Sequence, residues 1–79
     1  MPTQHFDLAA ARTFVELNQL LKLVGLCDSG GAGKLLVDSG RVLVDGVQEL
    51  RRTAKIHAGQ VVSVGTLRIV IRAPAPTPQ

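Results

Sequence analysis

The chain has 79 residues, a formal net charge of +3 and only two aromatic residues, both of them Phe. A chain of this length forms one small domain with a modest core, which excludes a large apolar ligand pocket. The lack of Tyr and Trp also argues against a single-strand binder that stacks successive bases on an aromatic platform.

Cysteine content and charge distribution indicate the compartment and the class of partner. The single cysteine, Cys27, cannot form an internal disulfide, so we expect a cytoplasmic protein. No signal peptide is recognisable, and no segment has the roughly 18 uninterrupted apolar residues that span a membrane. Residues 1–28 carry two cations and three acids, whereas residues 29–79 carry seven cations and three acids. A one-sided basic excess favours a polyanionic partner, although a solubilising surface gives the same pattern.

The first part of the chain predicts one clear helix. We expect residues 1–12 to be flexible or weakly ordered, with Asp7 as an alternative cap for a short helix. Residues 13–15 are β-prone and predict a short extended piece. From Glu16 onward, apolar residues recur at the i, i+3, i+4, i+7 spacing of one helical face, and Gly25 is expected to end this helix. The predicted apolar face consists of Leu17, Leu20, Leu21 and Val24.

A second helix is predicted between Ser29, a favourable N-cap residue, and Gly40. Together the two helices make an αα-hairpin. The same spacing predicts an apolar face of Ala32, Leu35, Leu36 and Ser39. Near the helix start lie three glycines, each of which costs up to about 1 kcal/mol relative to Ala in a helix interior. Such a cost favours a close approach to the backbone, either by the first helix or by a phosphate, at Gly30, Gly31 and Gly33.

The rest of the chain predicts two hairpins. Asp45-Gly46 is a type I′ turn signal between residues 42–44 and 47–50. Gly65-Thr66 fits a two-residue turn between residues 60–64 and 67–71. These elements predict a single domain over residues 13–72.

Two segments lie outside the hairpins. Residues 51–55 carry three cations and no acid, which predicts a basic loop. Residues 73–79 contain three prolines and predict a disordered, extended tail.

No motif for catalysis, a metal or a nucleotide is complete. The run Gly30-Gly31-Ala32-Gly33-Lys34 differs from a P-loop, because Asp28 replaces the first glycine and Leu35 replaces the final Ser or Thr. Cys27 precedes a helix, where thiol pKa values can be lowered, but a half-buried structural residue is the favoured interpretation. One Cys and two His at unrelated spacings do not make a zinc site. We therefore expect no enzyme, no cofactor and no metal.

The order of these elements resembles the alpha-L RNA-binding domain, named after small-subunit ribosomal protein S-four. The resemblance covers residues 15–64 and is carried by residues 17–26, 40–46 and 49–55 together with Ser29-Gly30-Gly31. The Ser-Gly-Gly start and the Glu-x-Arg-Arg-x-x-Lys segment are most similar to the small stand-alone bacterial members of the YbcJ/YaaA type. The resemblance implies an α+β fold in which two short packed helices precede a small, mainly antiparallel β-sheet of hairpins.

The resemblance also implies non-enzymatic binding of structured RNA, ribosomal or otherwise folded, through the second helix and the following loop. By position, the expected contacts are Lys22, Ser29, Gly30, Gly31, Lys34, Arg41, Arg51, Arg52 and Lys55. The protein is expected to be a monomer, without a membrane or small-molecule partner. Two alternatives stay open: an adaptor that binds an acidic protein with the same basic face, and DNA binding.

Three positions depart from the family pattern. Gly33 stands where Ala is usual and is expected to loosen the second helix; Asp45 stands where Asn is common, and Gln60 where Asp is usual. None of these departures removes a cation, so the expected binding surface is kept.

Overall fold

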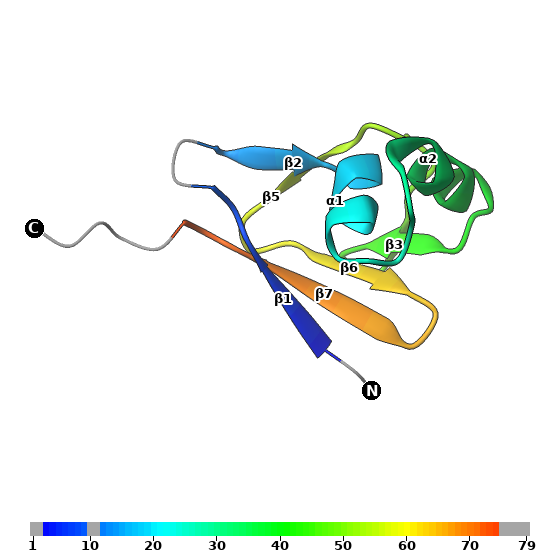
Figure 1. The fold of residues 1–79 in the computed structure, drawn as a ribbon. Helices are drawn as coiled ribbons and strands as arrows, with labels where there is room; N and C mark the ends of the chain where they lie inside the picture. Colours follow the sequence, from blue (N-terminus) through cyan, green and yellow to red (C-terminus); the bar gives the residue numbers. More distant parts are fainter. Residues whose placement is uncertain (1–2, 10–11, 75–79) are drawn as a thin grey trace, which may run out of the picture.

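The structure, a computed structural model, describes residues 3–9 and 12–74. The first half contains β1 (Thr3–Asp7), β2 (Phe14–Glu16), α1 (Leu17–Leu23) and α2 (Gly30–Asp38). The second half contains β3 (Val42–Val44), β4 (Val47–Gln48), β5 (Lys55–His57), β6 (Val61–Val64) and β7 (Leu67–Arg72). The two helices lie together beside the main sheet, while β2 and β5 form a separate ribbon (Figure 1). The α+β class of packed helices followed by hairpins is confirmed.

The main sheet has the strand order β1-β7-β6-β3-β4. Its strands β7, β6, β3 and β4 pair antiparallel, as expected for two hairpins. Strand β1 pairs parallel with β7, so that Thr3 lies opposite Arg68 and Asp7 opposite Arg72. The β2–β5 ribbon is antiparallel and places Phe14 opposite His57.

Strand β1 differs from the weakly ordered segment that the sequence predicts over residues 1–12. Thr3–Asp7 alternate between exposed and half-buried residues, and just after the strand the Leu8 backbone N–H donates to the Arg72 carbonyl. Asp7 forms an ion pair with Arg72 instead of capping a helix. Residues 10–11 of the alternative helix and residues 75–79 of the predicted tail lie outside the described residues.

Helix α1 has the apolar face that its spacing predicts. Leu17, Leu20 and Leu21 are fully buried, and Val24 packs against the same core. Gly25 follows the helix with a φ of +85°, a conformation that glycine adopts without steric cost.

Helix α2 begins as predicted, because the Ser29 side chain accepts a hydrogen bond from the Ala32 N–H at 3.1 Å. The predicted apolar face is correct only in part: Ala32 and Leu36 are half-buried, and Leu36 packs against the core. Leu35, however, is 72% exposed, and the buried residues are Gly33 and Val37. A Cβ atom at Gly33 would lie 2.6 Å from the Asn18 carbonyl oxygen of α1. Gly33 therefore lies where the two helices approach most tightly, and this contact sets which side of α2 faces inward.

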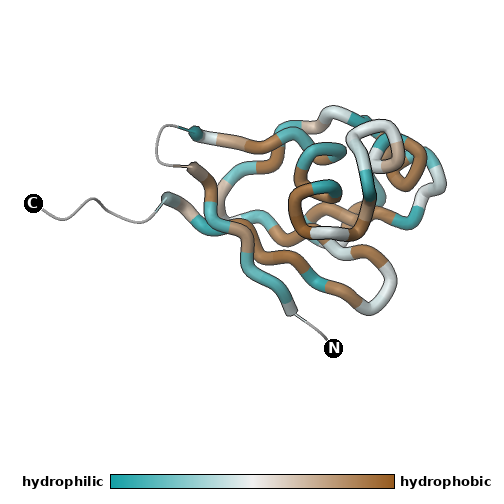
Figure 2. Tube along the Cα trace, viewed as in Figure 1, coloured by the Kyte–Doolittle hydropathy of each residue, from teal (hydrophilic) through white to brown (hydrophobic). Residues whose placement is uncertain are grey.

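The core is shared by both helices and the strands that they face, and Figure 2 shows hydrophobic residues along these segments. Its largest fully buried side chains are Leu17, Leu20, Leu21, Ile56, Ile69, Ile71, Val37, Val42 and Val62. In the part of the chain that the structure describes, no helix combines the length and apolarity needed to cross a membrane.

Candidate nucleic-acid interface

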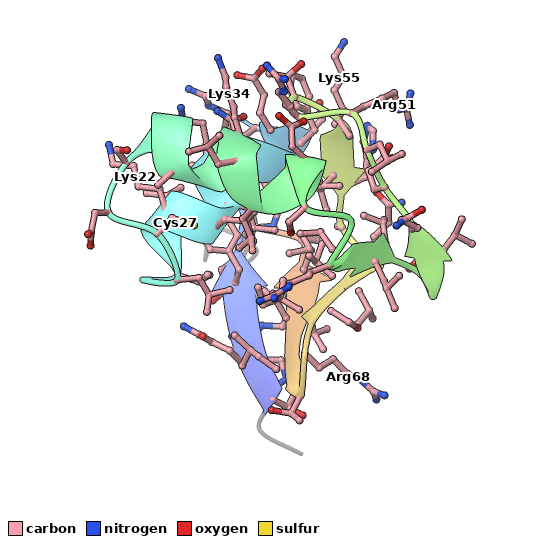
Figure 3. The ribbon with its side chains drawn as sticks, turned by 90° about the vertical axis from the view of Figure 1, so that its right-hand side faces the viewer. Lys22, Cys27, Lys34, Arg51, Lys55 and Arg68 are labelled. Carbon is pink, nitrogen blue, oxygen red and sulfur yellow. The ribbon has the colours of Figure 1, made fainter. Side chains whose placement is uncertain are left out.

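An open groove of about 830 Å³ lies between α2 and the segment from Leu50 to His57. Four of the predicted contacts line it, namely Lys34, Arg51, Arg52 and Lys55. Figure 3 shows Lys34, Arg51 and Lys55 at the same end of the molecule, far from Arg68. We call this feature the basic groove.

The arginine-bearing loop is fastened to both helices. At the start of α1, the Leu17 N–H donates to the Ala54 carbonyl at 2.9 Å, and the Asn18 N–H donates to the Arg52 carbonyl at 3.1 Å. These two amides belong to the first turn of a helix, where backbone donors have no partner within the helix. The Arg52 guanidinium also forms a two-point ion pair with Asp38 of α2, with N–O distances of 2.8 and 2.7 Å. The loop is therefore held in place before any ligand binds.

Arg51 is paired in the same way with Glu49. Its Nε and Nη2 atoms lie 3.1 and 3.0 Å from the two carboxylate oxygens, and its backbone N–H donates to one of them. Hydrogen bonding to Arg51 lowers the pKa of Glu49 below its usual value, and each carboxylate raises the pKa of the arginine that it binds. A guanidinium has five N–H donors in a plane, so the ion pairs fix the orientation of Arg51 and Arg52 and leave further donors for an anion.

An aromatic pair borders the basic groove. The Lys55 ammonium lies 5.1 Å from the centroid of the Phe14 ring, a cation–π distance. The ring centroids of Phe14 and His57 are 6.1 Å apart, and His57 lines the groove. Phe14 and His57 are not among the contacts predicted from the sequence, because the pairing of β2 with β5 is not encoded in any local pattern.

The remaining predicted contacts do not line the basic groove. Ser29, Gly30 and Gly31 form the start of α2. Lys22 lies in the last turn of α1 and does not line the groove. Arg41 is exposed beyond the other end of α2. Lys22 and Arg41 could therefore contact only a ligand that extends past the groove.

Other chemistry is not supported by the described residues. Within residues 3–9 and 12–74, no group of three or more His, Cys, Asp or Glu is placed to hold a metal ion. Burial raises the pKa of the Cys27 thiol, and the carboxylate of Asp28 raises it further. A raised pKa is the opposite of what a reactive thiolate requires.

Comparison with known proteins gives one family and two close relatives. Residues 8–72 match the model of the S4 domain. The protein YbcJ of Escherichia coli (strain K12), provisionally named an RNA-binding protein, is 51% identical over 49 residues, which is 62% of this chain and 70% of that protein. The uncharacterised YbcJ of Shigella flexneri matches to the same extent.

A solved structure is similar over most of its length. The solution structure of Escherichia coli YbcJ, described as revealing an AlfaL motif involved in RNA binding, superposes with a TM-score of 0.61 at 41% identity. The similarity covers 84% of this chain and 85% of that chain.

Proposed function

The chain belongs to the S4 domain family, and from this premise we propose that it binds a folded RNA in its basic groove without catalysing a reaction. The observation that supports the groove as the site is the convergence of Lys34, Arg51, Arg52 and Lys55 around one open concavity. The RNA-binding description of Escherichia coli YbcJ agrees with this proposal.

The chemistry of the groove suits the backbone of a folded RNA. Cations on a rigid support bind phosphates, and these contacts position a protein on a nucleic acid. Double-stranded RNA is recognised mostly through its shape, its phosphates and its 2′-hydroxyls. The paired arginines act as oriented fork-shaped donors for phosphate oxygens, whereas Lys34 and Lys55 act as point charges.

The contacts outside the groove serve as flanking sites in this proposal. The start of α2, at Ser29 to Gly31, offers backbone amides to a further phosphate. Lys22 and Arg41 contact phosphates of an RNA that runs beyond the groove. The groove cations therefore dominate binding to a short RNA, and the flanking cations matter more as the RNA lengthens.

The salt dependence of binding tests the proposal. With a labelled A-form RNA hairpin as the probe, four groove contacts give a slope of log K against log salt of about −3 to −3.6. Replacing Arg51, Arg52 and Lys55 together by Ala is expected to weaken binding strongly and to reduce the magnitude of the slope by about 2 to 2.7. Arg68→Ala, which removes one exposed cation at the far end of the molecule, is the control for loss of a cation outside the groove and is expected to leave the slope unchanged.

The outcome depends on both variants being folded, which thermal unfolding establishes independently. A folded triple variant with unchanged affinity and slope would refute the groove as the site. Competition by duplex DNA or by an acidic peptide at equal charge concentration separates RNA binding from general polyanion binding. Sequencing of the RNA that is crosslinked to the intact protein in cells then identifies the target.

A further inference from the structure

A second hollow, of about 420 Å³, lies between β1, β2 and α1. Both phenylalanines of the chain, Phe6 and Phe14, line it. Three polar side chains line it as well, Arg12, Glu16 and Gln19. Leu23, which is 60% exposed, completes an apolar side of the hollow. The hollow thus combines flat apolar surfaces with hydrogen-bonding groups.

The hollow and the basic groove meet at the β2–β5 ribbon. Phe14 and Glu16 line the hollow, and their cross-strand partners His57 and Lys55 line the groove. Side chains directly opposite each other on antiparallel strands lie about 5 Å apart at Cβ. The Lys55 ammonium also lies over the Phe14 ring. A phosphate bound by Lys55 would therefore hold its own nucleotide beside the hollow.

The lining matches the needs of a nucleobase. Unpaired bases in RNA are bound by stacking on aromatic side chains and by hydrogen bonds to their exposed edges. Phe14 and Phe6 offer the stacking surfaces, while the amide of Gln19, the carboxylate of Glu16 and the guanidinium of Arg12 offer both donors and acceptors. A site of this size can hold one base and not a run of bases, which is consistent with the low aromatic content.

We propose that this hollow receives a single unpaired base of the RNA whose backbone lies in the basic groove. The inference rests on the proposed function and makes it more specific: the ligand is a helical RNA that carries a bulged or terminal unpaired nucleotide. The scarcity of aromatic residues excludes an extended stacking platform, but it does not exclude a pocket for one base.

Two RNA hairpins that differ by one nucleotide test the inference. One has a fully paired stem, and the other has the same stem with a single bulged nucleotide. Stacking of one base is worth about 1–3 kcal/mol, so the bulged hairpin is expected to bind about 5- to 150-fold more tightly. Phe14→Leu keeps an apolar side chain but removes the ring, and it is expected to bring the ratio of the two affinities to about 1; the ratio is the readout, because the Phe14 ring also contacts Lys55 of the groove. Val47→Ala, at an exposed apolar residue of β4, is the control and keeps the preference.

Proton NMR of the unaltered protein provides a second measurement that does not depend on a variant. The chain has two Phe, two His and no Tyr or Trp, so its aromatic spectrum contains few rings. The ring resonances of Phe6, which lines the hollow and not the basic groove, are expected to shift on addition of the bulged hairpin and to stay in place with the paired one. Equal affinity for both hairpins without a Phe6 shift would overturn the base pocket and leave the groove proposal intact. Failure to bind either hairpin would overturn both.

Discussion

Gly33 shows how one missing side chain sets the distance between two helices. A Cβ atom at this position would lie 2.6 Å from the Asn18 carbonyl oxygen and 3.1 Å from its Cα. Gly33, which lowers the helix propensity of this segment, is thus a packing residue and not part of a phosphate loop. Its place in α2 costs helix propensity, which the close contact with α1 offsets.

We predict that Gly33→Ala destabilises the protein by about 1–2 kcal/mol, because the strain of overpacking, about 1–3 kcal/mol, exceeds the gain of up to about 1 kcal/mol in helix propensity. Urea unfolding measures the change. Gly31→Ala is a matched control in the same helix, since its Cβ would meet nothing closer than the Ser29 hydroxyl at 3.8 Å. It is expected to be neutral or stabilising. Equal effects of the two substitutions would contradict the packing role of Gly33.

Two of the departures from the family pattern contact each other. Asp45 has a φ of +52° in the turn before β4, and its carboxylate accepts hydrogen bonds from the Val61 N–H at 3.0 Å and from the Gln60 amide at 3.2 Å. The side-chain oxygen Oε1 of Gln60 in turn accepts from the His57 backbone N–H at 2.8 Å. The two residues therefore act as a unit that ties the first hairpin to the start of β6.

Asp45→Asn is predicted to cost about 0.5–1.5 kcal/mol of unfolding free energy, because it replaces one acceptor by a donor facing the Gln60 amide. Asn tolerates the left-handed backbone, so the turn itself is kept. Chemical denaturation of a double-mutant cycle with Gln60→Ala isolates the pair. The loss of unfolding free energy caused by Asp45→Asn is expected to be smaller in the Gln60→Ala background. An equal loss in both backgrounds would show that it does not come from the contact between Asp45 and Gln60.

At the scale of elements, the sequence predicts local features better than the direction in which an element faces. The apolar face of α1 is predictable because Leu17, Leu20 and Leu21 recur at helical spacing, although the buried side of the helix also includes the polar Asn18. In α2 the spacing is misleading at Leu35, which remains 72% exposed, whereas Leu36 packs against the core. The buried side of this helix is set by Gly33, which carries no hydrophobic signal. Packing against a neighbour overrides the pattern within the helix.

Glu49, in the loop between β4 and β5, is predicted to make a pH-dependent contribution to the free energy of unfolding. Hydrogen bonding to Arg51 lowers the pKa of Glu49 from its usual 4.5, so the folded state favours the ionised carboxylate. This contribution is fully present above pH 4.5 and is lost as the pH falls through the lower pKa of the folded state. The difference in unfolding free energy between the unaltered protein and Glu49→Gln should therefore shrink as the pH is lowered below 4.5.

Urea unfolding over a pH series measures this difference. An Arg51→Met background is the control, because it removes the side-chain hydrogen bond that is the largest cause of the lowered Glu49 pKa. In that background the effect of Glu49→Gln is expected to lose most of its dependence on pH in the acidic range. A difference that stays constant down to the most acidic pH would contradict the assignment.

At the scale of the whole molecule, the candidate site depends on contacts between distant segments. The cations of residues 51–55 are recognisable from composition, but the groove exists because α1 amides hold this loop and Asp38 of α2 holds Arg52. The pairing of Phe14 with His57 likewise joins two segments that are distant in the sequence. Sequence patterns identify which residues are basic or apolar, whereas the placement of the basic groove beside the hollow follows only from the assembled fold.

Strand β1 is the clearest case of such a long-range contact. Its removal tests the stability of the fold separately from the binding of RNA in the groove. The strand covers the edge of β7 opposite residues 68–72, and it brings Phe6 against the core.

Deleting residues 1–7 is predicted to destabilise the protein by about 1–3 kcal/mol, from lost strand hydrogen bonds and partial exposure of apolar surface. Thermal unfolding measures the loss. Asp7→Asn, which breaks only the exposed ion pair with Arg72, is the control and should change stability by less than about 1 kcal/mol. The basic groove contains no residue of β1. The truncated protein is therefore expected to keep its affinity for a paired RNA hairpin under conditions where it is folded. It is expected to lose the preference for a bulged hairpin, because the truncation removes Phe6 from the hollow.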